Sequence, residues 1–361
     1  MLYFLYPLKD ISIFFNLFRY ITFRAAGASI FAFLFCIWIA PFMIQWLRSL
    51  KVLAHTEREH AEKIHTFFAG KKNVPSMGGI IIVVSVVVSM LLWGNLTNRN
   101  VWILIGAILW FAGVGFWDDW LKMRSKSSKG ISSRMKMFGQ VAMGGVIGVV
   151  LFMDPTYDKW VYLPFLKSAF LYLGWFYIPF CILVLVGTSN ALNLTDGLDG
   201  LAIGCTLFTA LSLGIISYFV GRVDFAQYLN ISYMADGGEI AVFCFALAGA
   251  SAGFLWFNCY PAEVIMGDTG SLSLGGALGT VAVLIKKELV LVIVGGVFVW
   301  EALSVMLQVA SFKLTKKRIF LMSPFHHHLQ LKGWPESKVT VRLWIVSMIL
   351  AIIGLATLKV R

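Results

Sequence analysis

Charged residues are scarce in this 361-residue chain: Asp, Glu, Lys and Arg make up 13% of it, whereas 59% of its residues are hydrophobic. A water-soluble protein of this length would carry roughly twice that share of charge. The apolar runs are continuous and lack the alternation of polar and apolar residues that a lipid-facing strand requires, which excludes a β-barrel. The sequence therefore predicts an all-α, polytopic membrane protein whose spans are helices.

Cysteine is also rare. The chain has five cysteines, none of them in C-x-x-C spacing, which favours packing roles over metal binding or redox chemistry. A cleavable signal sequence is not indicated, because residues 1–24 mix charged and aromatic residues ahead of a full-length span. We expect residues 1–24 to form an interfacial N-terminal segment. No stretch is left for a large soluble domain, so residues 1–361 are expected to form a single integral membrane domain.

Ten apolar segments qualify as spans, each near the roughly 20 residues that a bilayer requires or somewhat shorter. Their approximate ranges are 25–47, 77–93, 101–117, 138–153, 168–186, 200–220, 240–257, 272–285, 289–311 and 339–358. About ten transmembrane helices, an even number, place both termini on the same side. The nine connections between them are called loops 1 to 9 in chain order.

Basic residues are distributed unevenly between the two sides. Loops 1, 3 and 9 carry 18 of the 30 Lys and Arg residues, and the even loops and termini together carry 11. Because an excess of Lys and Arg marks the cytoplasmic side, the odd loops are expected to be cytoplasmic and both termini extracytoplasmic. Such a face would attract a polyanion or an anionic headgroup; the alternative is that these residues only set the topology. No nucleic-acid partner is expected.

Five unusual polar motifs all fall in the odd loops, which favours one cytoplasmic site built from five loops. They are K-K-N-V-P-S-M-G-G at 71–79, D-D at 118–119, N-A-L-N-L-T-D-G-L-D-G at 190–200, N-C-Y-P-A-E-V-I-M-G-D-T-G-S at 258–271 and H-H-H at 326–328.

Asp118 and Asp119 close the third predicted span, where a helix C-terminus would prefer a cation. Two adjacent carboxylates become favourable there if a cation lies between them and other acids, and hard oxygen ligands of this kind suit Mg²⁺ better than zinc. The alternative is a solvated pair of loop residues. Lys122 lies one turn further on if the helix continues.

Loop 5 repeats Asx residues every three positions, at Asn190, Asn193, Asp196 and Asp199. Glycines beside the two aspartates permit close approach of the backbone. Asx-rich turns also form without any ligand. The loop has no basic residue, however, which is unusual for a cytoplasmic segment whose charges serve only the topology.

Asp268 lies in G-D-T-G-S, directly before the eighth predicted span. That span has only about 14 apolar residues, roughly 21 Å of helix, so Asp268 is expected to lie below the membrane surface in a cleft. N-capping would explain an Asp at a helix start, but a carboxylate at such depth is costly unless it is partnered, which makes it a functional candidate. Glu301, within the ninth predicted span, is a functional candidate for the same reason. The alternative is that an interhelical hydrogen bond satisfies its carboxylate.

His326, His327 and His328 follow M-S-P-F in loop 9. Adjacent histidines cannot all face one ligand from a regular helix, but two of them could contact a phosphate or sugar while the third packs. Zinc binding lacks a supporting cysteine pair or H-E-x-x-H spacing. An ordinary loop cluster is the alternative.

Taken together, these motifs resemble those of the phospho-N-acetylmuramoyl-pentapeptide transferases, a branch of the polyprenyl-phosphate N-acetylhexosamine-1-phosphate transferase superfamily. The resemblance covers nearly the whole chain. D-D and G-D-x-G-S are shared across the superfamily, whereas H-H-H followed by L-K-G-W-P, at 326–335, is typical of the muramoyl branch. Two positions depart from the family pattern: Val74-Pro75-Ser76 stands where many relatives have Thr-Pro-Thr, and Ile265 where many have Phe, so stacking of uracil on an aromatic ring is not expected at Ile265.

The resemblance implies transfer of phospho-MurNAc-pentapeptide from UDP-MurNAc-pentapeptide to undecaprenyl phosphate, giving lipid I and UMP, with Mg²⁺ required. This is the first membrane step of peptidoglycan synthesis, at the cytoplasmic face of the bacterial cytoplasmic (inner) membrane. Either direct attack or a covalent phospho-aspartate intermediate is compatible with it. A homodimer is also compatible with the sequence.

The resemblance also implies roles for individual residues. Asp268 would bind the metal, and one of Asp118 and Asp119 would activate the lipid phosphate while the other positions it or the metal. Lys122 and the three histidines would meet phosphates or sugar. The residues implied for substrate binding, mainly in the nucleotide pocket, are Lys71, Asn190, Asn193, Asp196, Asp199 and Asn258.

Two alternative functions stay open at this point. A transporter could use Asp268 and Glu301 as a cation path, but it would show inverted repeats and acids deep in several spans, and the sequence has no convincing repeat. A UDP-GlcNAc:polyprenyl-phosphate GlcNAc-1-phosphate transferase is the alternative within the enzyme class. A purely structural membrane protein is a third, remote reading.

Overall fold

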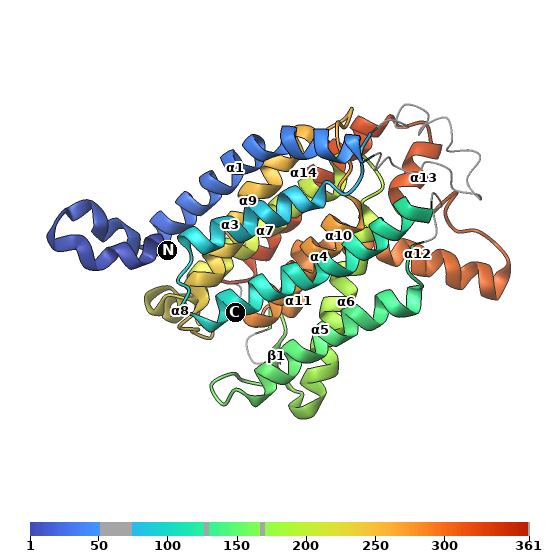
Figure 1. Ribbon diagram of the computed structural model, residues 1–361. Coiled ribbons are helices and arrows are strands. Elements are labelled where there is room, and N and C mark those ends of the chain that lie inside the picture. The colour runs from blue at the N-terminus through green and yellow to red at the C-terminus, as the bar shows by residue number, and fades with distance from the viewer. Residues whose placement is uncertain (51–73, 126–129, 167–169, 360–361) are drawn as a thin grey trace.

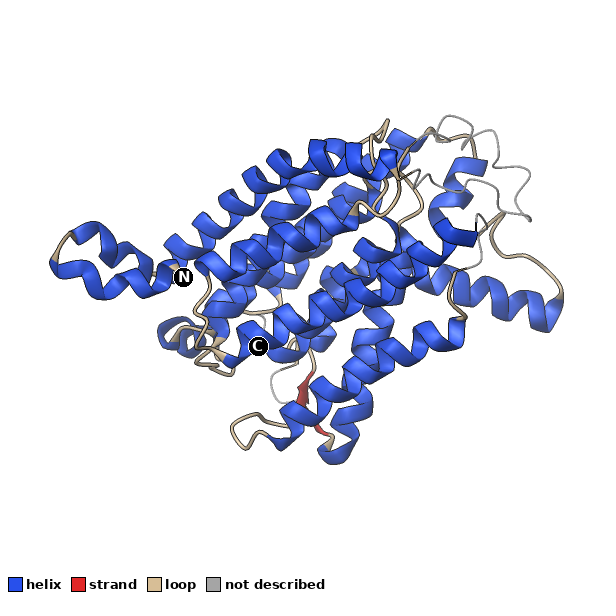
Figure 2. Cartoon of the chain, in the orientation of Figure 1, coloured by secondary structure: helices blue, strands red, loops and turns tan. Residues whose placement is uncertain are grey.

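The computed structural model describes residues 1–50, 74–125, 130–166 and 170–359, and its regular structure there is almost entirely helical (Figures 1 and 2). Within these residues, eight helical segments are long and apolar enough to cross a membrane, and one apolar helix is shorter. The chain is therefore a polytopic helical membrane protein, as its composition predicts. The longer helices are α1 (Ile21–Ser49), α3 (Gly79–Trp93), α4 (Arg99–Ser125), α5 (Ser133–Met153), α6 (Tyr177–Thr195), α7 (Leu201–Val220), α9 (Gly237–Asn258), α10 (Gly267–Leu284), α12 (Gly296–Thr315) and α14 (Glu336–Ala356).

Shorter elements connect these helices. They are the 3-10 helices η1 (Leu2–Asp10), η2 (Ile13–Arg19) and η5 (Gly174–Phe176), the α-helices α8 (Val223–Leu229), α11 (Glu288–Val294) and α13 (Phe325–Leu331), and the strands β1 (Trp160–Tyr162) and β2 (Phe170–Tyr172). The two strands pair antiparallel, with Trp160 opposite Tyr172. Residues 1–24 thus comprise two 3-10 helices and the first turn of α1, and their interfacial position stays a prediction.

Helix α10 lies inside the bundle, with every residue from Thr269 to Leu284 buried. Helices α3, α4 and α6 pack against it. Its sequence is rich in glycine and serine, and small residues let neighbouring backbones approach closely within a membrane protein. A helix enclosed by other helices does not need the hydropathy of one that faces lipid. The 14-residue apolar run therefore understates this helix, which has 18 residues and includes Asp268.

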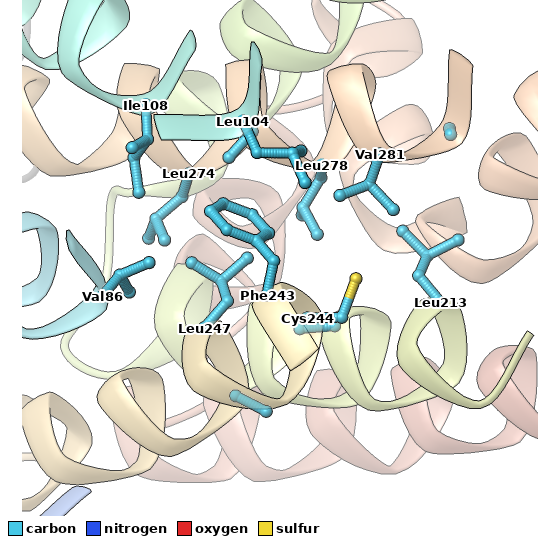
Figure 3. Packing of buried hydrophobic residues seen from close by; sticks show 14 of the residues in the cluster. Val86, Leu104, Ile108, Leu213, Phe243, Cys244, Leu247, Leu274, Leu278 and Val281 are labelled. Carbon is cyan, nitrogen blue, oxygen red and sulfur yellow. The ribbon is translucent and has the colours of Figure 1, made fainter. Parts of the chain in front are cut away.

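The buried apolar core joins α10 to the helices around it (Figure 3). Phe243 of α9 points toward Leu274 of α10 and Leu104 of α4, and its side chain is fully buried. Packing of this kind fixes the relative positions of three helices, and the polar ends of two of them, α4 and α10, carry the candidate site.

The two ends of the bundle differ in character. At one end, the amino group of Met1 donates a hydrogen bond to Leu91 O, and Lys359 Nζ donates one to Tyr228 O. Both termini therefore lie near the same end, together with α8, and α13 lies toward the opposite end (Figure 1). The even number of spans predicts this arrangement of the termini.

Three predicted boundaries are wrong. The third predicted span continues to Ser125, so Asp118 and Asp119 lie inside α4 and not at its end. An Asp118–Lys122 ion pair at i,i+4 spacing stabilises this extension. The fifth span begins at Tyr177, not near 168, because the aromatic and β-branched residues before it form the β1–β2 hairpin. The ninth span is divided into α11 and α12 at Gly295.

Two segments expected to be loops are helical. Residues 187–195 form the last turns of α6, where Thr188, Asn190 and Thr195 hydrogen-bond to backbone carbonyls four residues earlier. These bonds let short polar side chains remain within a helix. The three histidines lie in α13, which begins directly after Pro324. Proline cannot donate a hydrogen bond and is well suited to precede a helix.

Candidate active site

Three carboxylates meet where α4 crosses the start of α10. Asp118, Asp119 and Asp268 each offer an oxygen atom, and these oxygens lie within 4.8 Å of one another. Asp118 and Asp119 are buried, and the side chain of Asp268 is 17% exposed. Carboxylates this close and this dry repel one another unless cations compensate their charge.

The close crossing depends on Gly115, one turn before Asp119 in α4. A Cβ atom at this position would lie 2.2 Å from Asp268 O and 2.7 Å from Thr269 Cα. Both of these atoms belong to the backbone of α10, so they cannot rotate away as a flexible side chain could. The absence of a side chain at Gly115 therefore allows α4 to approach the first turn of α10.

Asp119 is committed to the N-terminus of α10. Its carboxylate accepts hydrogen bonds from the backbone N–H groups of Asp268 and Thr269, at 3.2 and 2.9 Å, and from Thr269 Oγ1 at 2.8 Å. The first N–H groups of a helix have no partner within the helix, and a carboxylate is a favourable acceptor for them. Asp119 thus caps α10 from a different helix and fixes the backbone of Asp268.

Asp268 is the most connected acid of the site. Its Oδ2 accepts from Lys122 Nζ at 3.0 Å and from Lys136 Nζ at 2.7 Å, and its Oδ1 accepts from Asn193 Nδ2 at 2.8 Å. Asn193 also donates to Ser271 Oγ at 2.7 Å. The side chain of Asp268 is therefore oriented by residues from α4, α5 and α6.

Asp118 completes the group. Its Oδ2 lies 2.5 Å from Lys122 Nζ, and its Oδ1 accepts from the backbone N–H of Ile131 at 2.9 Å. We call Asp118, Asp119, Asp268, Lys122 and Lys136 the acid–lysine centre. With three carboxylates and two ammonium groups in their ordinary ionised forms, its formal charge is −1. Several hard oxygen donors with a negative sum are suited to Mg²⁺, so the donor set fits the expected metal.

A second polar cluster holds the turn 196–200, which joins α6 to α7. Asn258 accepts from Gly200 N at 3.2 Å and donates to Val264 O at 2.8 Å, and Asp199 accepts from Ala262 N at 3.1 Å. Both side chains are buried. Asn258 and Asp199, which were expected to bind substrate, make contacts that join this turn to the segment after α9.

Asn190 and Asp196, two other Asx residues of the segment predicted as loop 5, have different surroundings. Asn190 exchanges hydrogen bonds with the buried side chain of Gln140, at 2.8 and 3.4 Å, and so ties α6 to α5. Asp196 follows the last residue of α6 and is partly exposed. Of the residues expected in the nucleotide pocket, only Asn193 contacts the acid–lysine centre among the described residues. Lys71 lies outside the described residues.

The three histidines are not equivalent. His326 and His327 are buried, whereas His328 is partly exposed and its Nδ1 accepts from Leu321 N at 3.1 Å. His327 Nδ1 lies 2.9 Å from Gln330 Oε1. His326 lies against Gly197 of the turn 196–200.

Four contributors to the site were not identified from the sequence. Lys136 lies in the first turn of α5, and its contact with Asp268 crosses 132 residues of chain. Thr269 donates to Asp119 from both its backbone N–H and its hydroxyl group. Gln140 hydrogen-bonds to the side chain of Asn190. Glu336 accepts from Asp199 N at 2.8 Å. Thr269 lies within the G-D-T-G-S motif, and Glu336 is the single acid of loop 9 and directly follows a proline, whereas no sequence signal sets Lys136 or Gln140 apart.

A helical bundle with three carboxylates and two lysines together at one end defines an integral membrane protein with a candidate active site. The model of the family described as glycosyl transferase family 4 matches residues 101–286, a segment that contains all three aspartates. Three curated proteins named phospho-N-acetylmuramoyl-pentapeptide-transferase are similar over at least 99% of both chains: those of Desulfotalea psychrophila (49% identical), Thermodesulfovibrio yellowstonii (50%) and Methylacidiphilum infernorum (47%). The chain belongs to glycosyl transferase family 4 and, within it, to the phospho-N-acetylmuramoyl-pentapeptide transferases.

Proposed function

We propose that this protein transfers phospho-MurNAc-pentapeptide from UDP-MurNAc-pentapeptide to undecaprenyl phosphate, forming lipid I and releasing UMP. The observation that carries the proposal is the acid–lysine centre at one end of a membrane bundle, in a chain 47–50% identical, over its full length, to proteins with this name. These relatives do not favour a GlcNAc-1-phosphate transferase. A transporter is not favoured either, because these relatives are named as transferases and the three aspartates gather at one point.

The reaction joins two polyanions. An oxygen of the lipid phosphate attacks the β-phosphorus of the sugar nucleotide, the bond from that phosphorus to the bridging oxygen breaks, and UMP leaves with the bond's electron pair. Such phosphoryl transfer depends mainly on positioning and on neutralising charge. Lys122 and Lys136 supply two ammonium groups beside Asp268, and we assign them to the phosphate oxygens.

The metal would be Mg²⁺, held by Asp268 with Asp118 and Asp119 near it. When bound, it would neutralise phosphate charge. Both lysines donate to Oδ2 of Asp268, which holds their ammonium groups beside the carboxylates that would bind the metal.

The two neighbouring aspartates differ in what they can do. Both oxygens of Asp119 accept hydrogen bonds from the start of α10, so we assign it to positioning. Asp118 contacts a side chain that can move, Lys122. We therefore assign Asp118 to orienting the lipid phosphate and removing its proton where one is present. This assignment favours direct attack by the lipid phosphate.

The sugar nucleotide would lie near the turn 196–200 and α13. Asn193 donates to Asp268 of the acid–lysine centre, and Asp196 begins the turn three residues later. Asn258 and Asp199 hold the turn in place, and the partly exposed His328 would face the sugar. Lys71 stays in the proposed nucleotide pocket on the resemblance alone. The site would face the cytoplasm at the bacterial inner membrane, and the homodimer stays an expectation.

The substrate assignment is tested with purified protein, undecaprenyl phosphate and Mg²⁺. UDP-MurNAc-pentapeptide and UDP-GlcNAc are offered in parallel, and released UMP is measured. We expect UMP only with the muramoyl substrate. Preferential turnover of UDP-GlcNAc would move the protein to the alternative branch, and UMP release independent of undecaprenyl phosphate would indicate hydrolysis instead of transfer.

A further inference from the structure

Glu301 is a fully buried acid in α12, outside the acid–lysine centre. Its two carboxylate oxygens lie 3.2 and 3.3 Å from the backbone N of His326, and Oε2 lies 3.2 Å from Nδ1 of the same residue. Burying a carboxylate costs several kcal/mol unless such partners compensate it. Among the described residues, the polar contacts of the Glu301 carboxylate all belong to His326, at the start of α13.

The other side of His326 meets the turn 196–200. A Cβ atom at Gly197 would lie 2.3 Å from His326 Nε2 and 2.8 Å from Cε1. Gly197 does not have a positive φ, so its backbone does not itself require glycine. Close contact with the imidazole ring is the feature that excludes a side chain there. His326 is thus held between Glu301 and Gly197.

This contact joins three elements that are distant in the sequence. Helix α13 has only seven residues, too few to be stable on its own, so its position depends on external contacts. Glu301 of α12 supplies one such contact, to His326. The ring of His326 in turn packs against Gly197, in the turn that contains Asp196 and Asp199. The side chains of His327 and His328 are placed by the same helix.

We propose that Glu301 is a positioning residue for the sugar-nucleotide pocket: through His326, it fixes α13 against the turn 196–200. The inference rests on the proposed function, because it assigns the pocket beside this turn to the sugar nucleotide. Glu301 touches no reacting group. Its loss is expected to weaken binding of the nucleotide sugar while the acid–lysine centre keeps its contacts.

The first test is Glu301→Gln, which keeps an acceptor for the N–H of His326 but removes the charge. We expect KM for UDP-MurNAc-pentapeptide to rise by about 10-fold, the scale for weakening a hydrogen bond to a charged group. Both kcat and the KM for undecaprenyl phosphate should stay within about threefold of the parent's values. Glu288→Gln is the matched control, because Glu288 is also buried but follows the far end of α10; it should leave both KM values unchanged. An unchanged KM for the sugar nucleotide in folded Glu301→Gln would overturn the proposal.

A second test does not depend on Glu301→Gln folding. Gly197→Ala should raise KM for the sugar nucleotide because the methyl group collides with His326. His326→Ala removes the colliding ring and should also raise KM. In the double variant, Gly197→Ala should add no further increase, since neighbouring residues that share one contact are not additive. Independent, multiplicative effects of the two changes would contradict the contact and overturn the proposal.

Binding of UMP, measured by calorimetry, separates this inference from the proposed function. If the parent protein does not turn over UDP-MurNAc-pentapeptide, the proposed function fails. If the parent turns it over and Glu301→Gln binds UMP as tightly as the parent with an unchanged KM, only the positioning role fails. A rise of about 10-fold in KM for the sugar nucleotide, with or without a change in the Kd for UMP, supports the positioning role.

Discussion

Asp119 of α4 accepts two hydrogen bonds from Thr269 of α10, one from the backbone N–H at 2.9 Å and one from the hydroxyl at 2.8 Å. Because Thr269 directly follows Asp268, this contact sets the position of the acid that contacts both Lys122 and Lys136. Two adjacent aspartates in one motif therefore have separate tasks. One fixes the geometry of the centre, and the other is left to act within it.

We expect different outcomes for the two variants Asp119→Ala and Asp118→Asn. Asp119→Ala removes three hydrogen bonds at the start of α10 and should lower stability by about 1–2 kcal/mol, the upper range for losing a helix cap, and turnover should fall with it. Asp118→Asn should reduce turnover by about 10²-fold or more with little change in thermal midpoint. Thermal unfolding in detergent and UMP release measure both. An Asp119→Ala protein as stable as the parent would contradict the capping role.

Gly115→Ala tests whether the site depends on the close crossing of α4 and α10. The new methyl group would lie 2.2 Å from Asp268 O, so the helices must separate and the carboxylate must move. A shift of about 1 Å can cost 10²-fold in rate, and we expect a loss of this size although no reactive group is removed.

Gly113→Ala is the matched control for that variant, because nothing lies within 4 Å of a Cβ atom at Gly113. Both changes raise the helix propensity of α4 equally. The control should therefore keep the parent's turnover. Equal activity in the two variants would show that the crossing does not position Asp268.

The helical, membrane-spanning class of the protein could be predicted because lipid imposes a strong constraint on sequence: each backbone polar group must be satisfied within a helix. Boundaries were less predictable where protein contacts replaced lipid. Helix α10 is enclosed by other helices, so its glycine and serine residues do not register as a full-length span. Polar residues 187–195 continue α6 by bonding to their own backbone, which hydropathy alone does not detect.

The residue types of the site could be predicted, but several of their tasks could not. Asp118, Asp119, Lys122, Asn193 and Asp268 come together as the motifs suggested. Lys136 is one of many basic residues in its loop, and only the three-dimensional structure selects it. Asn258 and His326 are residue types that often bind ligands. Their burial against other parts of the chain depends on the tertiary structure, which the sequence does not reveal.

His328 predicts an acid-sensitive contact at α13. Two effects lower the pKa of His328 below its ordinary value of 6.5: mainly its burial and, to a smaller extent, the positive charge of nearby Lys332. Its Nδ1 must be unprotonated to accept from Leu321 N. Above pH 6.5 the imidazole is neutral in both the folded and unfolded protein, and this contact is intact. As the pH falls below 6.5, the unfolded protein takes up the proton more readily, so the folded protein is destabilised.

The corresponding experiment compares thermal midpoints between pH 7.5 and 5.5 for the parent and His328→Gln. Glutamine offers an acceptor that does not titrate, so the midpoint of the variant should fall less on acidification. Parallel curves for the two proteins would mean that His328 does not contribute to the pH dependence.

The membrane orientation is tested by single cysteines at Ser133 and Asp224 in a chain freed of its five native cysteines. Both positions are exposed; Ser133 opens α5 near Lys136 of the site, and Asp224 lies in α8 near the termini. The excess of basic residues in the odd loops predicts that an impermeant thiol reagent applied to intact cells labels position 224 and not position 133. Labelling at 133 alone would reverse the orientation.

Transfer of a labelled phosphate tests the central assignment most directly. UDP-MurNAc-pentapeptide carrying ³²P only in the β-phosphate is incubated with undecaprenyl phosphate, Mg²⁺ and either the parent, Asp268→Asn or the control Asp158→Asn, whose residue lies apart from the site and pairs with Lys286. The parent and control should move the label into the organic-soluble lipid and release unlabelled UMP. Asp268→Asn should slow this transfer by about 10²–10³-fold. Label that stays in the aqueous phase with the parent, or transfer at the parental rate by Asp268→Asn, would contradict the proposed reaction or its site.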